Sequence, residues 1–125
     1  MHKNKIIRDT ILNLLSKNPK VILTEPLKYD ELISIMKISH FIITDSGGIQ
    51  EETTYLGINC LTLRDETERP ITVQKGTNKV IGTDKENIIN EINNVLGSKI
   101  SNEAKIKYWD GETSDRIFQI LFGQI

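Results

Sequence analysis

The sequence predicts an α/β fold, a Rossmann-like doubly wound domain with a buried parallel sheet. Short apolar runs alternate along the chain with longer segments whose apolar residues recur at helical spacing. The connections between them are short, and two glycines, Gly47 and Gly48, lie just after one of the apolar runs. This alternation is typical of parallel strands buried between helices.

The first third of the chain predicts two helices and two strands. The spacing of apolar residues in 3–17 predicts a helix. Val21–Leu23 is a short apolar run that predicts a buried strand. Asp30 is the expected N-cap of a second helix that ends near His40. Phe41–Thr44 is the next predicted strand.

The middle of the chain repeats this order around Ser46, Gly47 and Gly48, a segment called the glycine turn below. Residues 49–56 predict a helix that ends at Gly57, a residue suited to a left-handed C-terminal position. Cys60–Leu63 is the third predicted strand, with Cys60 buried in it, and residues 64–70 form a charged loop.

The last third predicts one more strand and two helices. Lys79–Ile81 is the strand, and Thr83 with Glu86 matches a capping box that opens a helix closed by Gly97. A final helix covers about 114–122. Because the chain begins on a helix rather than a strand, we expect 1–125 to be a single partial domain that lacks its first βα unit.

Length and composition restrict the functional class. The 125 residues fit one domain, and a net charge of −1 argues against a nucleic-acid partner. The single cysteine excludes a disulfide framework and a Cys-rich zinc site. The absence of a long apolar run or a signal-like N-terminus predicts a cytoplasmic protein with no membrane partner.

The glycine turn is the strongest candidate site. A helix N-terminus offers free N–H groups and a positive dipole end, and Gly47 and Gly48 allow a ligand close to the backbone. Ser46 adds a hydroxyl, and the turn follows a strand, where open α/β sheets bind ligands. The pattern thus indicates a phosphate site. The alternative is a tight turn in which Ser46 or Asp45 only caps the helix.

Charged residues around the turn suggest how a ligand would be held. Glu52 lies four residues after Gly48, on the same helical face, and could accept bonds from sugar hydroxyls. Glu51 points about 100° away and is expected to be solvated. Arg69, held extended before a proline, suits phosphate recognition, unless it pairs with a neighbouring acid.

Several blocks of sequence resemble one enzyme family. They are TDSGGIQEETTYLG at 44–57, CLTLRDETERP at 60–70, Gly76-Thr77 and VIGTD at 80–84. In order and spacing, these closely resemble the C-terminal domain of non-hydrolysing UDP-N-acetylglucosamine 2-epimerases. The similarity runs from about residue 2 to Trp109-Asp110-Gly111 and Arg116-Ile117, nearly the whole chain but only about a third of a full epimerase.

The resemblance implies a fold, a reaction and residue roles. The family has the GT-B architecture of two Rossmann-like domains, and interconverts UDP-N-acetylglucosamine and UDP-N-acetylmannosamine by eliminating and re-adding UDP. No metal or other cofactor is implied. Ser46 and Gly48 would contact the diphosphate, Glu52 the ribose hydroxyls and Arg69 the nucleotide.

The chain departs from the family pattern in two respects. Leu27 and Leu32 stand where many members have a Gln and a Phe at the uracil pocket. The family's acid/base carboxylates lie in an N-terminal domain that this chain lacks. The resemblance therefore implies that no catalytic residue lies in this chain, which would be inactive until a separate N-terminal half completes it.

Two alternative functions stay open. A GT-B glycosyltransferase-type donor-binding domain would also use a glycine turn followed by a helical glutamate, although the DETERP block favours the epimerase. A truncated, non-catalytic remnant would bind UDP weakly or not at all. Assembly of the chain into a homo-oligomer is also open.

Overall fold

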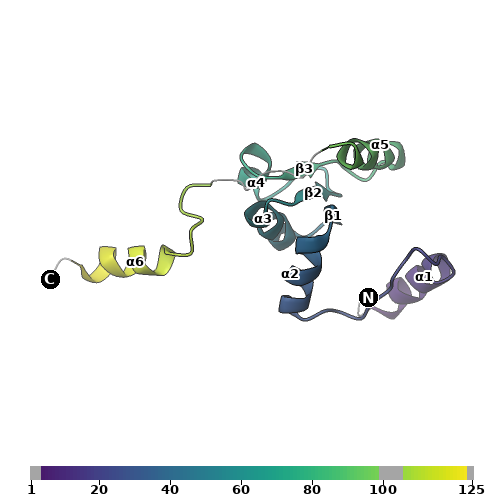
Figure 1. Cartoon of the computed structure of the whole chain (residues 1–125), viewed down its shortest axis with the longest axis horizontal. Helices are drawn as coiled ribbons and strands as arrows, with labels where there is room; N and C mark the ends of the chain where they lie inside the picture. The colour runs from purple at the N-terminus through teal and green to yellow at the C-terminus, as the bar shows by residue number, and fades with distance from the viewer. Residues whose placement is uncertain (1–3, 99–105, 124–125) are drawn as a thin grey trace. The chain divides into compact units, whose positions relative to one another are not determined.

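The computed structural model describes residues 4–98 and 106–123 of the chain (Figure 1). It divides into two compact units, residues 1–35 and 36–125. The boundary falls within helix α2, Tyr29–Ile38. The candidate site belongs to the second unit.

The first unit contains helix α1, Lys5–Leu15, which begins at Asn4, whose side chain accepts a hydrogen bond from the Ile6 N–H. Arg8 makes two hydrogen bonds to the Glu25 carboxylate, at 3.1 and 2.6 Å, and so ties the helix to the segment that follows. The predicted strand Val21–Leu23 is wrong: the segment has no regular structure. An apolar run becomes a strand only where another strand completes its hydrogen bonds.

The second unit is built on a parallel three-stranded sheet in the order β1-β2-β3. Strand β1 is Phe41–Thr44, β2 is Asn59–Thr62 and β3 is Asn78–Val80. Phe41 pairs with Asn59, and Cys60 pairs with Asn78. Three of the four predicted strands and the α/β class with a parallel sheet are therefore confirmed.

The helices begin and end close to the predicted positions, with two corrections. Helix α2 begins at Tyr29, so Asp30 lies inside its first turn and is not the N-cap. Helix α3, Gly47–Leu56, ends at Gly57, which has the expected left-handed conformation with φ of 71°. Helix α5, Lys85–Leu96, is capped by Asp84, whose side chain accepts the Asn87 N–H, so the capping box at Thr83 is wrong by one residue. Helix α6 is Thr113–Phe122.

Helix α4, Pro70–Gln74, lies in a stretch where no helix was predicted. Its five residues are too few to show a helical period. Proline at its first position provides a fixed φ that suits a helix start. The helix follows Arg69 directly and so limits where that residue can lie.

The core of the second unit is as polar as it is apolar. Its buried apolar residues are Met36, Ile58, Cys60, Leu61 and Ile81. Its buried polar residues are Gln50, Thr53, Thr54, Thr62, Thr72 and Asn78. Burial raises the pKa of the Cys60 thiol, in keeping with the expected core role.

Asn78 joins the polar part of this core. Its Nδ2 donates to Gln50 Oε1 at 3.1 Å and to Thr72 Oγ1 at 3.0 Å. Its Oδ1 accepts from Thr62 Oγ1 at 2.5 Å. These partners come from α3, α4 and β2, so one side chain on β3 links four elements.

Two blocks that carry the family resemblance meet before helix α6. Arg116 Nη1 and Nη2 donate to Asp110 at 2.9 and 2.7 Å, and the Glu112 N–H donates to the same carboxylate at 3.1 Å. The Arg116 hydrogen bonds are the main reason that the pKa of Asp110 falls to about 2. Asp110 thus stays ionised and holds the start of the helix.

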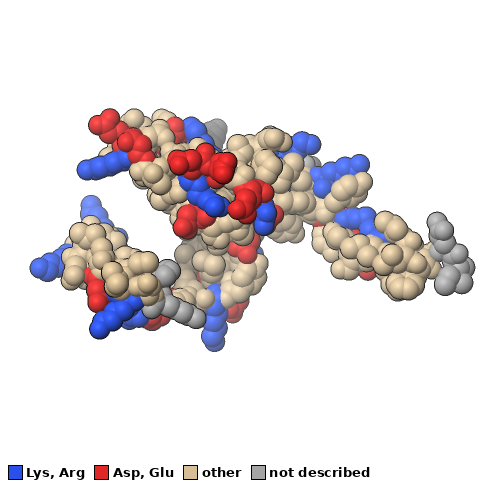
Figure 2. Space-filling model, turned by 180° about the vertical axis from the view of Figure 1, so that it is seen from behind, with Lys and Arg blue, Asp and Glu red and all other residues tan. Residues whose placement is uncertain are grey.

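Acidic and basic side chains are interspersed on the face shown in Figure 2. None of the helices in the described part of the chain has the length and apolar character needed to cross a membrane.

Gly76 provides a test of the packing between α3 and α4. A Cβ at this position would lie 2.4 Å from Thr72 O and 2.5 Å from Thr54 Cγ2. Because backbone cannot yield easily, we expect Gly76→Ala to lower the free energy of unfolding by about 1–3 kcal/mol in urea denaturation. The matched control is Gly97→Ala, whose Cβ would meet nothing closer than 3.6 Å. Equal stability of the two variants would contradict the tight contact at Gly76.

Candidate functional site

The glycine turn connects β1 to α3 in an extended conformation. Ser46 has φ of −85° and ψ of 127°, and its side chain makes no capping hydrogen bond. Its N–H donates to Thr44 Oγ1 at 3.0 Å, and its carbonyl accepts the Gln50 N–H at 3.3 Å. The backbone of Ser46 therefore starts the helix, while its exposed hydroxyl is not used for capping.

The first turn of α3 has the properties of an anion site. The N–H groups of Gly47, Gly48 and Ile49 precede the first residue that can bond a carbonyl within the helix. The positive end of the helix dipole lies at the same point. Gly48 is exposed, and a Cβ there would approach only Ser46 Oγ, at 3.9 Å.

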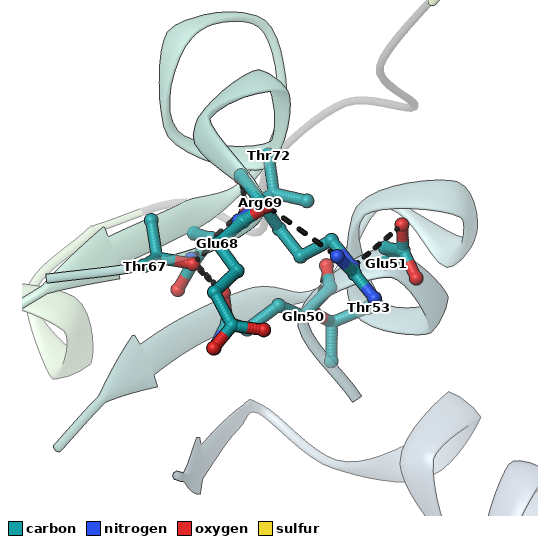
Figure 3. Close-up of polar contacts among 8 residues, drawn as sticks. Gln50, Glu51, Thr53, Thr67, Glu68, Arg69 and Thr72 are labelled. Atoms are coloured by element: carbon teal, nitrogen blue, oxygen red, sulfur yellow. Dashed lines mark hydrogen bonds and ion pairs between the residues drawn. The ribbon is translucent and has the colours of Figure 1, made fainter. Parts of the chain in front are cut away.

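Arg69 lies against this turn. A Cβ built on Gly47 would be 3.8 Å from Arg69 Cγ and 3.9 Å from Arg69 Nε, which is van der Waals contact. The side chain of Arg69 reaches from the loop before α4 toward α3 (Figure 3). The structure thus brings together the turn and the arginine that the sequence identified separately.

Glu51 stays partly exposed, as expected, but it also pairs with Arg69, which was not expected. Arg69 Nε lies 3.1 Å from Glu51 Oε1, and the two side chains are 43% and 42% exposed. Arg69 Nε itself is buried and forms no hydrogen bond, so the contact is electrostatic rather than a directed bond. Glu51 lies one turn beyond Gly47 on the same face of α3, which brings it to the arginine. Arg69 thus pairs with an acid on α3 rather than with an acid of its own loop.

Glu52 is half-buried on α3, one turn beyond Gly48. Four residues along a helix return to nearly the same face, about 6 Å further along the axis. Within the described residues, its carboxylate has no hydrogen bond or ion pair. Its oxygens are thus free to accept hydrogen bonds close to the turn.

A set of buried polar residues behind Arg69 was missed. Gln50, Thr53 and Thr54 are fully buried on α3, and Thr72 is fully buried on α4. Thr67, in the loop, donates to Gln50 Oε1 at 2.6 Å. The spacing of Gln50, Thr53 and Thr54 is that of one helical face, so a stripe of neutral polar residues at i, i+3 and i+4 was the available signal.

Two leucines singled out in the sequence lie outside the second unit. Leu27 and Leu32 are half-buried residues of the first unit. In residues 4–98 and 106–123, no group of three or more His, Cys, Asp or Glu side chains is arranged to hold a metal ion.

Comparison with known proteins identifies the family. The family model described as UDP-N-acetylglucosamine 2-epimerase matches residues 1–122. The chain is 41% identical over 125 residues to UDP-N-acetylglucosamine 2-epimerase of Bacillus subtilis and 40% identical to that of Campylobacter jejuni. Each alignment covers 97% of this chain and 33% of the relative. The chain thus spans about a third of the length of the curated relatives it matches.

Solved structures show the same similarity. A structure of S. aureus MnaA with UDP has a TM-score of 0.87 and 38% identity, and the match covers 100% of this chain and 35% of that one. The UDP-GlcNAc 2-epimerase from Neisseria meningitidis bound to UDP-GlcNAc has a TM-score of 0.71 and 44% identity over 77% of this chain and 26% of that one. The chain therefore has the α/β fold of the corresponding part of these GT-B-like enzymes, and it belongs to the UDP-N-acetylglucosamine 2-epimerase family.

Proposed function

We propose that this chain is the UDP-binding part of a UDP-N-acetylglucosamine 2-epimerase. It would act in the interconversion of UDP-N-acetylglucosamine and UDP-N-acetylmannosamine, once an N-terminal domain completes it. The observation that carries the proposal is that the Arg69 side chain lies where a side chain at Gly47 would touch it, beside a Ser46 hydroxyl that caps nothing. A cation, a row of N–H groups and a free hydroxyl thus lie at the same turn, and each of them can bind an anion.

The proposed roles follow from the chemistry of the groups. The N–H groups at Gly47 and Gly48, the Ser46 hydroxyl and the Arg69 guanidinium would hold the diphosphate. Glu52 would accept hydrogen bonds from the ribose hydroxyls, because a carboxylate has only acceptors and a ribose supplies two donors. When the bond between the sugar and the diphosphate breaks, the electron pair goes to the UDP oxygen. Donors at that position would stabilise the charge that develops there.

The domain organisation and cellular setting are part of the same proposal. Residues 1–125 would form a partial nucleotide-sugar-binding domain of a cytoplasmic protein. The groups that move the proton at the reacting carbon would come from the N-terminal half. The match to the epimerase model over residues 1–122 supports an epimerase rather than a glycosyltransferase.

The first test is a calorimetric titration of the chain with UDP, UDP-N-acetylglucosamine and ADP. We expect UDP and UDP-N-acetylglucosamine to bind and ADP to bind more weakly. In a coupled assay the same preparation should give no epimerisation, because acid–base groups each supply about 10²–10⁴-fold and none is assigned here. A chain that folds but binds no UDP would instead indicate a non-binding remnant. Turnover by this chain would require an acid–base group within it.

Ser46→Ala separates ligand binding from helix capping. We expect the UDP affinity to fall by about 1.5–3 kcal/mol, the range for a hydrogen bond to a charged group. The melting temperature should change little, because the Ser46 side chain makes no capping bond. The control is Ser98→Ala, which removes an exposed hydroxyl bonded to Val95 O after α5. A stability loss of about 0.5–2 kcal/mol with unchanged affinity would show that Ser46 is only a cap.

Glu52→Gln tests the ribose contact. Loss of one acceptor and of the charge should weaken UDP binding by about 1.5–3 kcal/mol, roughly 10–150-fold in calorimetry. Coulomb repulsion alone predicts the opposite, since removing a negative charge near a diphosphate should tighten binding. The helix dipole predicts only a stability loss of about 0.3–1 kcal/mol. The sign of the affinity change thus decides between these explanations.

The control for Glu52→Gln is Glu86→Gln, an identical charge change in the first turn of α5. Glu51→Gln is unsuitable as a control because Glu51 pairs with Arg69. If Glu52→Gln bound UDP more tightly, or if Glu52→Gln and Glu86→Gln changed the UDP affinity equally, the ribose contact would be ruled out.

A further inference from the structure

The backbone of Arg69 is held on both sides by threonine hydroxyls. Its N–H donates to Thr67 Oγ1 at 3.0 Å. Its carbonyl accepts from Thr72 Oγ1 at 2.7 Å and from the Thr72 N–H at 3.0 Å. These contacts fix the point from which the arginine side chain leaves the loop (Figure 3).

The hydroxyl of Thr67 joins this backbone to helix α3. A backbone N–H can only donate, so Thr67 Oγ1 accepts from Arg69 and uses its own hydrogen for Gln50 Oε1, at 2.6 Å. Gln50 is fully buried, and its Oε1 also accepts from Asn78 Nδ2 at 3.1 Å. Both partners donate to the same oxygen, which defines the orientation of the Gln50 amide.

The guanidinium of Arg69 is held much less firmly than its backbone. Its partners are the half-exposed Glu51 carboxylate and, at 3.4 Å, the Glu68 carbonyl. An exposed ion pair adds little rigidity, and an arginine side chain carries about 2 kcal/mol of rotamer entropy. The position of the side chain near Gly47 therefore depends on the part-buried hydrogen bonds of the backbone.

We propose that Gln50 and Thr67 are positioning residues that hold Arg69 over the glycine turn for a phosphate-bearing ligand. The inference rests on the proposed function, with UDP as the probe. Gln50 belongs to the helix whose N-terminus forms the turn, whereas Thr67 and Arg69 belong to the loop. The Gln50–Thr67 hydrogen bond thus fixes the position of the loop relative to α3, and these two elements together form the phosphate site.

The test compares Thr67→Val, which keeps the shape and removes the hydroxyl, with Thr67→Ser, which keeps the hydroxyl. We expect UDP affinity in calorimetry to fall about tenfold in Thr67→Val and to remain near that of the unmodified chain in Thr67→Ser. Thr53→Val is the matched control. It removes a fully buried hydroxyl on α3 whose hydrogen bonds go to Ile49 O and Gln50 O rather than to Arg69 or Thr67.

A double-mutant cycle shows whether Thr67 acts through Arg69. In an Arg69→Ala background, Thr67→Val should cause no further loss of affinity, although it would still lower stability to the same extent as in the unmodified chain. An affinity loss of equal size in both backgrounds would overturn the proposal. So would a Thr67→Val variant that binds UDP as tightly as Thr67→Ser.

Amide hydrogen exchange at Arg69 tests the positioning without a ligand. Exchange should be faster in Thr67→Val and be restored in Thr67→Ser, and unchanged exchange would overturn the positioning role. If the unmodified chain binds no UDP, the proposed function fails, and exchange at Arg69 alone decides whether Thr67 positions it. Should Thr67→Val not fold, Thr67→Ala serves for the same comparisons.

Discussion

The second unit depends on the two amide side chains at its centre, Asn78 and Gln50. Asn78 forms hydrogen bonds with Gln50, Thr72 and Thr62, and so links β3 to α3, α4 and β2. Few apolar residues are buried around these groups, so directed hydrogen bonds, rather than apolar area, define how the elements fit together. Buried polar groups demand partners, and the directed hydrogen bonds between them favour one arrangement over its competitors.

The same network carries the candidate site on its surface. The glycine turn is the first part of α3, and Arg69 immediately precedes α4, so any shift between these helices would separate the cation from the turn. Gln50 Nε2 remains buried without a partner, which costs free energy that a simple apolar core would avoid. Because Gln50 carries this cost, its presence is better explained by its hydrogen bond to Thr67, which holds the loop in place, than by its own contribution to stability.

The sequence predicted most of the secondary structure because apolar periodicity and glycine conformations are local properties. It failed at Val21–Leu23, because an apolar run does not reveal whether a neighbouring strand exists, and at α4, which is shorter than two helical turns. The turn residues were identified from the sequence, but the contact of Arg69 with Gly47 and Glu51 was not. These residues are about 20 positions apart, and only the packing of α3 on α4 brings them together.

The order of the strands has a consequence for how this part of the chain assembles. Both strand pairings join residues 18 positions apart in the sequence. In the central network, the hydrogen bond between the most distant residues, Gln50 and Asn78, joins positions 28 apart. The entropy lost on closing a loop grows with the logarithm of its length, so contacts this near in the sequence cost somewhat less entropy than contacts between distant residues. Every group assigned to the ligand lies inside that continuous segment of the polypeptide. The groups assigned to the ligand are therefore brought together by contacts within residues 41–80.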